Sequence, residues 1–83
     1  MSNQILKFSA AWCGPCKSMS ATLGRIQLPV NVVEVDVDEQ HELAAKYAIR
    51  GVPTLVMVDS NGAEISRLVG SKTEAELKNW VTA

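Results

Sequence analysis

The sequence is organised around the stretch WCGPCK at residues 12–17. The run Ile5–Ser9 before it alternates between two faces, as the side chains of a β-strand do. Within the stretch, Pro15 suits the first turn of a helix, where its missing N–H is no loss. Apolar residues then recur at helical spacing as far as Ile26. The two cysteines therefore lie where a strand passes into the N-terminus of a helix.

Cys13 and Cys16 admit four interpretations. The first is redox catalysis, because unpaired N–H groups and the positive dipole end of a helix stabilise a thiolate at Cys13. Cys16, in the first turn and buried relative to Cys13, would then resolve a mixed disulfide. The others are half of a zinc site, a structural disulfide and two inert buried thiols. We favour redox catalysis and expect no metal site within the chain, since His41 is the only histidine.

Three more strands are predicted by their period of two, at Val32–Val37, Thr54–Val58 and about Glu64–Val69. The residues Asp59–Gly62 between the last two predict a hairpin, because Asn-Gly tolerates positive φ. A strand-helix-strand unit requires a parallel pair with a right-handed crossover, whereas a hairpin requires an antiparallel pair. The sheet is therefore expected to be mixed.

Two further helices are indicated by their terminal residues. Asp38 is a candidate N-cap for the first, and Gly51 is its candidate C-cap. For the second, the run Thr73–Glu76 fits a capping box. The side chains expected on the apolar faces of these helices are Leu43, Ala44 and Tyr47 in the first and Leu77, Trp80 and Val81 in the second. The predicted order is β-α-β-α-β-β-α.

Length and charge exclude several classes of protein. With 83 residues the chain forms one small domain, residues 1–83. Eight Lys and Arg against nine Asp and Glu leave no basic surface for nucleic acid or an anionic membrane. Two cysteines are too few for a disulfide-rich secreted scaffold. We see no targeting segment and no membrane-length apolar run, so we expect a cytoplasmic protein.

Together with the stretch IRGVPT at residues 49–54, the WCGPCK stretch resembles the thioredoxin family. The resemblance covers nearly the whole chain from Gln4 onward. It implies an α/β thioredoxin-like fold with a mixed four-stranded sheet and helices on both faces. Ordinary thioredoxins begin with an additional strand and helix that this sequence lacks, so the strand Val32–Val37 is expected at the edge of the sheet.

The resemblance also implies roles for individual residues. Cys13 would be the attacking nucleophile and Cys16 the resolving thiol. Pro53 matches the family's cis-proline beside the disulfide, and Val52 would offer its backbone to an extended substrate. The remaining substrate-binding residues implied by the resemblance are Trp12, Gly14, Pro15, Gly51, Val69 and Gly70.

Position 7 departs from the family pattern. Thioredoxins usually carry a buried aspartate there, with a partner lysine on the neighbouring strand; here the residues are Lys7 and Glu34, so the charges are exchanged. A lone buried ammonium is costly, so Lys7 needs a partner. One hypothesis is that Lys7 and Glu34 pair across adjacent strands and relay the proton of Cys16. The other is that Lys7 reaches past the missing helix into solvent.

The function implied is a protein disulfide reductase, a dithiol electron carrier with no bound cofactor beyond its own reversible disulfide. By resemblance, an NADPH-dependent flavoprotein reductase would regenerate the dithiol, because the chain has no nucleotide-binding motif. We expect a monomer. The alternatives are a glutaredoxin-like carrier that uses glutathione, a thioredoxin-like binding subunit whose thiols are dispensable, and a metal-bridged dimer.

Overall fold

Strand β1 (Gln4–Ser9) lies inside a four-stranded sheet of order β2-β1-β3-β4. This architecture comes from a computed structural model that describes residues 3–83. β1 pairs in parallel with β2 (Asn31–Asp36) and antiparallel with β3 (Thr54–Val58), which pairs antiparallel with β4 (Glu64–Val69). The predicted mixed sheet is confirmed, and β2 is an edge strand.

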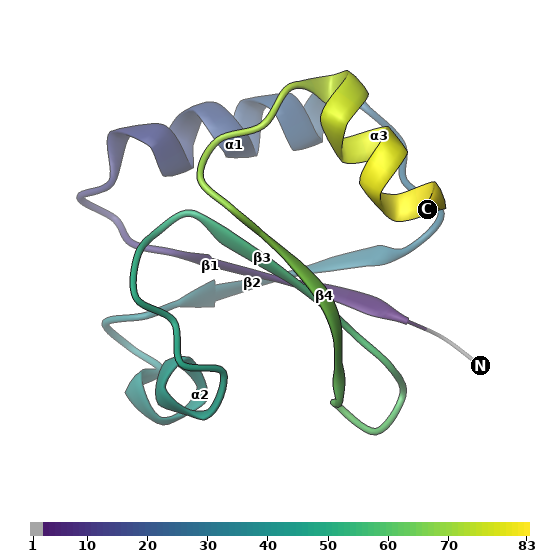
Figure 1. Cartoon of the computed structure of the whole chain (residues 1–83). Coiled ribbons are helices and arrows are strands. Elements are labelled where there is room, and N and C mark those ends of the chain that lie inside the picture. Colours follow the sequence, from purple (N-terminus) through teal and green to yellow (C-terminus); the bar gives the residue numbers. More distant parts are fainter. Residues whose placement is uncertain (1–2) are drawn as a thin grey trace.

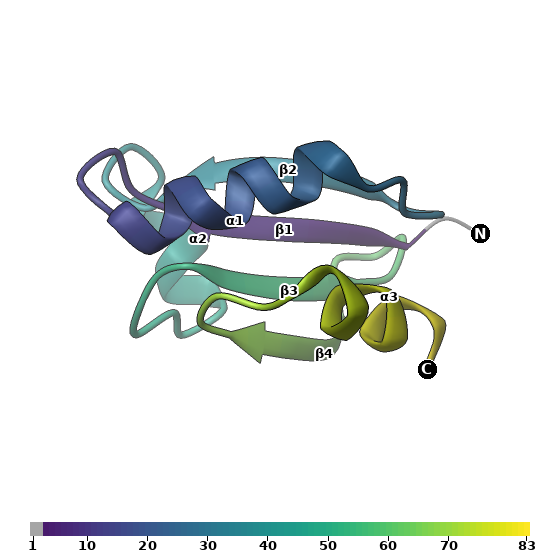
Figure 2. The ribbon, with the colours of Figure 1, turned by 90° about the horizontal axis from the view of Figure 1, so that it is seen from above.

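The helices divide between the two faces of the sheet (Figure 1). α1 (Gly14–Arg25) and α3 (Glu74–Thr82) cover one face, with α1 over the β1–β2 side and α3 over the β3–β4 side (Figure 2). α2 (His41–Lys46) lies against the other face. None of the helices within residues 3–83 is both long and apolar enough to cross a membrane.

Two apolar clusters hold these layers together. Leu6 and Phe8 of β1 contribute to the cluster under α2, whereas Ile5 contributes to the cluster under α1 and α3. The alternation along β1 therefore has the predicted period of two. Lys7 shares the side of Ile5 but belongs to neither apolar cluster, and it is buried together with Ser9 on the same side of the strand.

The predicted hairpin and capping box are both present. Gly62 has a φ of +82°, and the Asp59 carboxylate accepts hydrogen bonds from the backbone N–H groups of Asn61 and Ala63. At α3, the Thr73 hydroxyl accepts a hydrogen bond from the backbone N–H of Glu76, whose carboxylate accepts one in return. Local sequence therefore determines both of these turns.

The prediction for α2 is wrong at both ends. Its N-cap is Gln40 rather than Asp38, because Asp36 ends β2 in a turn and its carboxylate accepts the backbone N–H of Asp38. Its C-cap is Tyr47, and the next residue, Ala48, takes a φ of +52° that reverses the chain before Gly51 is reached. α2 is therefore shorter than expected, and a loop separates it from β3.

Candidate functional site

The two cysteines form a disulfide at the N-terminus of α1. Cys13 is the N-cap of the helix, and its Sγ accepts a hydrogen bond from the backbone N–H of Cys16 at 3.1 Å. Pro15 lies in the first turn, as predicted. The helix begins here because β1 ends at Ser9 and the backbone N–H of Cys13 bonds to the Ala10 carbonyl.

Burial of the pair differs from the prediction. Cys13 is 4% exposed and Cys16 is 3% exposed, so the expectation that Cys16 would be buried relative to Cys13 is wrong for the disulfide. Ala10 forms one buried cluster with the two cysteines, and the partly buried Val37 and Val52 pack against this cluster. A substrate disulfide must therefore approach through the surface formed by the residues around the pair.

The loop before β3 forms one side of this surface. The peptide bond between Val52 and Pro53 is cis, and Pro53 is buried. The Pro53 carbonyl accepts the backbone N–H of Gly70, and the Thr54 hydroxyl donates to the Gly51 carbonyl. The first of these bonds joins the cis-proline loop to Gly70, and Val52 of the same loop packs against the cluster that contains the two cysteines.

Trp12 directly precedes Cys13 in the chain, and its side chain is 70% exposed. Its indole N–H donates to the Asp38 carboxylate at 2.9 Å, which holds the ring over an open groove of about 180 Å³. The groove is lined by Trp12, Val37, Ala44, Ile49, Arg50, Gly51 and Val52. Asp38 thus binds Trp12 instead of capping a helix, which is the function that the sequence predicts for it.

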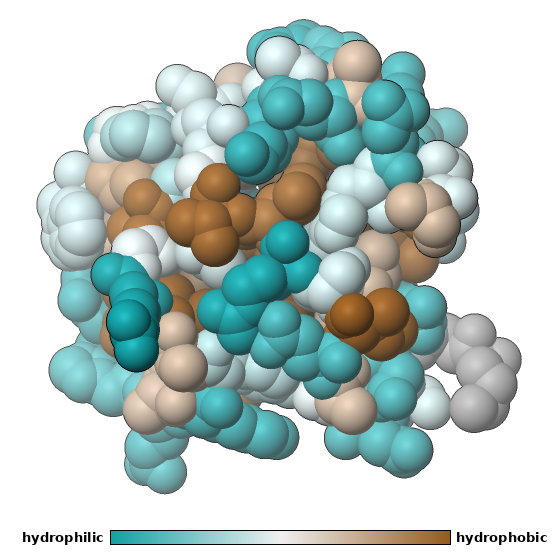
Figure 3. All heavy atoms as spheres, viewed as in Figure 1, coloured by the Kyte–Doolittle hydropathy of each residue, from teal (hydrophilic) through white to brown (hydrophobic). Residues whose placement is uncertain are grey.

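Exposed apolar surface extends along β4. Val69 is 61% exposed, and Ile65 is also exposed. On the side shown in Figure 3, apolar surface is divided into two areas by hydrophilic side chains. The predicted residue Val69 therefore offers contact area to a partner, Gly14 and Pro15 are also exposed, and Gly70 is half-buried.

Lys7 and Glu34 form the lateral pair that the sequence suggested. They are direct partners in the β1–β2 register, and Lys7 Nζ lies 2.7 Å from Glu34 Oε1. Lys7 is 1% exposed, so the alternative in which it reaches solvent is wrong. Ser20 of α1 and Ser9 complete the network, Ser20 by accepting from Lys7 and Ser9 by donating to Glu34. Neither serine belongs to a sequence motif, so their contacts with Lys7 and Glu34 could not be predicted.

His41 does not join the site. It begins α2, on the face of the sheet opposite α1 (Figure 1). Within residues 3–83, no group of three or more His, Cys, Asp or Glu side chains is arranged to hold a metal ion. Within the described part of this chain, no third zinc ligand therefore lies beside the two cysteines.

Comparison with known proteins identifies a family. The family model described as Thioredoxin matches residues 1–83. The chain is 40% identical over 73 residues to thioredoxin H5 of Oryza sativa, covering 84% of this chain but 53% of that protein. It is 39% identical over 82 residues to a thioredoxin of Echinococcus granulosus, covering 95% of this chain and 75% of that protein. The chain thus spans only part of the length of these relatives.

Solved structures agree with the sequence comparison. A mutant thioredoxin from Halobacterium salinarum superposes with a TM-score of 0.86 at 35% identity, covering 96% of this chain and 72% of that one. Fasciola hepatica thioredoxin has a TM-score of 0.86 at 33% identity, covering 98% of this chain and 79% of that one. The fold of this chain is therefore that of the solved thioredoxins it superposes on.

Proposed function

The chain belongs to the thioredoxin family, and we propose that it reduces disulfides of protein substrates by cycling between a Cys13–Cys16 dithiol and the disulfide. The observation that carries the proposal is the position of the pair. Cys13 Sγ is the N-cap of α1 and accepts the Cys16 amide N–H, so a thiolate there is stabilised by a hydrogen bond and the helix dipole.

The chemistry is a pair of thiol–disulfide exchanges. The Cys13 thiolate attacks one sulfur of the substrate, a mixed disulfide forms, and the other substrate sulfur leaves as a thiolate. The Cys16 thiolate then attacks Cys13 Sγ, which breaks the mixed disulfide and releases the second substrate thiolate. Two electrons pass to the substrate, and the cysteine pair ends as the disulfide.

Substrate would bind beside the cis-proline loop. The N–H and C=O groups of Val52 have no backbone hydrogen-bond partner among residues 3–83, so they are free to pair with an extended segment. Trp12 and Val69 supply exposed apolar area on either side. A peptide that carries a disulfide next to an apolar residue fits this surface.

Glu34 is the proposed acceptor of the Cys16 proton, in the relay with Lys7. Its side chain is 61% exposed and it lines the same pocket as Cys16, so water can connect the two groups. Replacing Glu34 with Gln is expected to change both the rate of release of the second substrate thiolate and the dependence of that rate on pH. An unchanged rate would contradict the relay.

Regeneration of the dithiol needs an external reductant. An NADPH-dependent flavoprotein reductase is the proposed donor, acting on a monomer in the reducing cytoplasm. The experiment compares two coupled assays of insulin reduction, one with NADPH and a thioredoxin reductase and one with glutathione and its reductase. Faster turnover with the first is expected; turnover only with glutathione would identify a glutaredoxin-like carrier instead.

A matched variant tests whether the thiols are needed at all. In a Cys13→Ser/Cys16→Ser protein we expect no insulin reduction with either reductant, and sedimentation velocity should show a monomer for both proteins. If cells that depend on this chain grew equally well with the double variant, the binding-subunit alternative would replace the carrier.

A further inference from the structure

Lys7 is a buried cation near the cysteine pair, and the exchange steps described above do not include its electrostatic effect on the thiols. It projects from β1 on the side of α1, and its Nζ donates to Ser20 Oγ and to Glu34 Oε1, both at 2.7 Å. Burying a charge is costly unless it is paired and hydrogen-bonded, and Lys7 satisfies both conditions. The ammonium is therefore held in one place by three elements, β1, β2 and α1.

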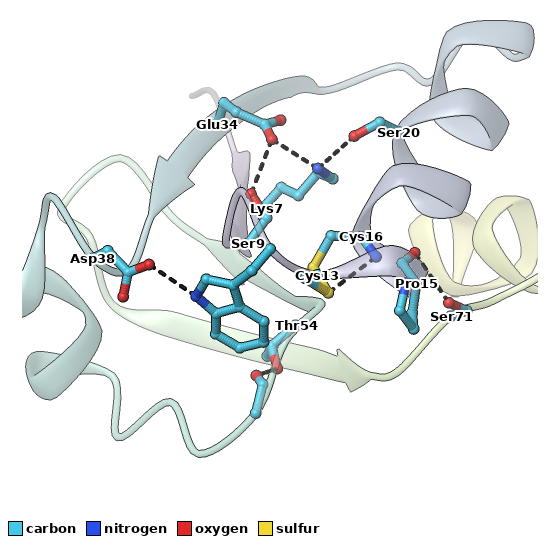
Figure 4. Close-up of a disulfide and its surroundings, with 12 residues drawn as sticks. Lys7, Ser9, Cys13, Pro15, Cys16, Ser20, Glu34, Asp38, Thr54 and Ser71 are labelled. Carbon is cyan, nitrogen blue, oxygen red and sulfur yellow. Dashed lines mark hydrogen bonds and ion pairs between the residues drawn. A yellow bond between two sulfur atoms is a disulfide. The ribbon is translucent and has the colours of Figure 1, made fainter.

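Lys7 and Cys16 line the same pocket. It is open to solvent, has a volume of about 220 Å³ and lies between the β1–β2 edge and the first turns of α1. Figure 4 shows the Lys7 side chain directed into the space beside the cysteine pair, toward Glu34 and Ser20. The charged, polar and sulfur groups that line the pocket are Lys7 and Ser9 of β1, Glu34 and Asp36 of β2, and Cys16, Lys17 and Ser20 of α1.

Among these groups, only Lys7 carries a charge that is removed from water. Lys17 and Glu34 are exposed, and Asp36 directs one carboxylate oxygen to the backbone N–H groups of the following turn. Exposed charges are screened by solvent and salt, whereas a buried charge is screened much less. The Lys7 ammonium is therefore the charge in this pocket that solvent and salt screen least.

We propose that the Lys7 ammonium stabilises the Cys16 thiolate in the reduced protein, and that Glu34 moderates this effect. Lys7 is thus a positioning residue for charge and not a catalytic residue. The proposal rests on the proposed function, since Cys16 is a free thiol only in the dithiol state. By resemblance, most thioredoxins place a carboxylate at position 7, which disfavours a neighbouring thiolate; the ammonium acts with the opposite sign.

The step affected is the second exchange. The Cys16 S–H bond breaks and its proton passes to water or Glu34. The thiolate then forms the bond to Cys13 Sγ while the mixed disulfide breaks and the substrate sulfur leaves as a thiolate. A lower pKa at Cys16 gives more thiolate at neutral pH, although each thiolate is a weaker nucleophile.

The equilibrium test is an NMR titration of the reduced protein, following the Cβ shift of labelled Cys16 from neutral to alkaline pH. Replacing Lys7 with Met should raise the pKa of Cys16 by about one unit, a tenfold change in the thiolate equilibrium. Lys7→Arg should preserve the wild-type value, and Glu34→Gln should shift the pKa downward. Lys17→Met, which removes an exposed lysine from the same pocket, is the matched control and should have a smaller effect than Lys7→Met.

The kinetic test is stopped-flow reaction of the reduced protein with an aromatic disulfide that releases a coloured thiolate at each exchange. With a Brønsted coefficient of about 0.4–0.5, a one-unit shift makes the second release in Lys7→Met about threefold slower at pH below the pKa of Cys16. At pH values above the Cys16 pKa of both proteins, the second release in Lys7→Met becomes about threefold faster than in the wild type. A purely structural defect would not make the two pH profiles cross.

Two results would overturn the proposal: a Cys16 titration that is unmoved or lowered in Lys7→Met, or shifts of the same sign in Lys7→Met and Glu34→Gln. If Lys7→Met does not fold, the same titration of Lys7→Gln decides the question, because glutamine removes the charge but keeps a polar group that can bond to Ser20 and Glu34. Neither measurement uses a protein substrate or a reductase. Failure of insulin reduction would therefore count against the proposed function, whereas the effect of Lys7 on Cys16 is judged only by the two measurements above.

Discussion

Helices α1 and α3 each begin with a side chain that accepts the backbone N–H three residues further on, at 3.1 Å in both cases. In α3 the acceptor is the Thr73 hydroxyl, and the residue that donates, Glu76, returns a hydrogen bond to the cap. In α1 the acceptor is Cys13 Sγ, and the residue that donates is Cys16. The same local geometry therefore serves an inert cap in one helix and a reactive sulfur in the other.

The two helices differ in the acidic side chains that lie near the positive end of the helix dipole. The first turn of α3 contains Glu74 and Glu76, whereas the first turn of α1 contains no acidic residue. Carboxylates in the first turn satisfy the free N–H groups and stabilise the helix. In α1 those groups remain available to a thiolate. The presence or absence of acidic residues in the first turn thus determines whether the helix N-terminus stabilises the fold or a reactive thiolate.

The largest effect should come from replacing the reactive cap with an ordinary one. Cys13→Ser keeps an oxygen that can accept the Cys16 amide, and serine is a strongly preferred N-cap. We expect the reduced variant to unfold at the same urea concentration as the reduced wild type, with insulin reduction lost completely. A large fall in the urea midpoint would show that the cysteine cap has a structural function that serine cannot replace.

The opposite effect is expected at α3. Thr73→Ala removes the hydroxyl of the capping box, which should cost about 1 kcal/mol of unfolding free energy. For a domain of this size that lowers the Tm by roughly 4–8 °C. Insulin reduction below the transition should equal that of the wild type. Thermal unfolding by circular dichroism measures the first quantity, and Thr73→Ser serves as the control that retains the cap.

Giving α1 an acidic first turn should make it resemble α3. Gly14 has no positive φ, and a Cβ at this position would meet nothing within 4 Å, so Gly14→Glu can be accommodated. A carboxylate at this position competes with the thiolate, and a charge at a helix end contributes about 0.3–1 kcal/mol. Alkylation of Cys13 at neutral pH should slow roughly two- to fivefold relative to Gly14→Gln. Equal rates for the two variants would show that the helix end does not control Cys13.

The smallest effect concerns the pH dependence of α3. The backbone N–H of Thr73 holds the pKa of the Glu76 carboxyl below its usual value of 4.5, with the Thr73 side chain contributing in the same direction. A group whose pKa is depressed by folding stabilises the folded protein above its unfolded pKa and loses that contribution as the pH falls through the folded pKa. Glu76→Gln should therefore flatten the acid limb of the urea midpoint below about pH 4.5. A variant whose acid limb matches that of the wild type would contradict this.

Features coded by neighbouring residues could be predicted from the sequence. The capping box at Thr73 and the turn at Gly62 depend on backbone and side-chain chemistry within a few residues, and both were found as expected. The bounds of β3 and β4 also agree, because each strand carries an unbroken run with turn residues beside it. The two family motifs also predict the fold, because each motif is a run of consecutive residues that can be recognised in the sequence.

Features that depend on tertiary contacts could not be predicted in the same way. Asp38 looks like a helix cap in the sequence, yet Asp36 forms the turn and Asp38 is left to bind Trp12 across the site. Whether Lys7 would be buried depended on how closely α1 and β2 cover it. Equal burial of the two cysteines depends on Val37 and Val52, which reach the pair from distant parts of the chain. In each case the residue type is recognisable in the sequence, whereas its burial or binding depends on contacts with residues far away in the chain.

The hydrogen bond between Cys16 N–H and Cys13 Sγ also supplies a spectroscopic reporter. Its acceptor is a neutral sulfur in the disulfide and a charged sulfur in the thiolate, and hydrogen bonds to charged acceptors are shorter and stronger. The amide proton of Cys16 should therefore resonate further downfield, and exchange with solvent more slowly, when Cys13 is ionised. One resonance would then report the oxidation state and the ionisation of the chain together, without any added label or substrate.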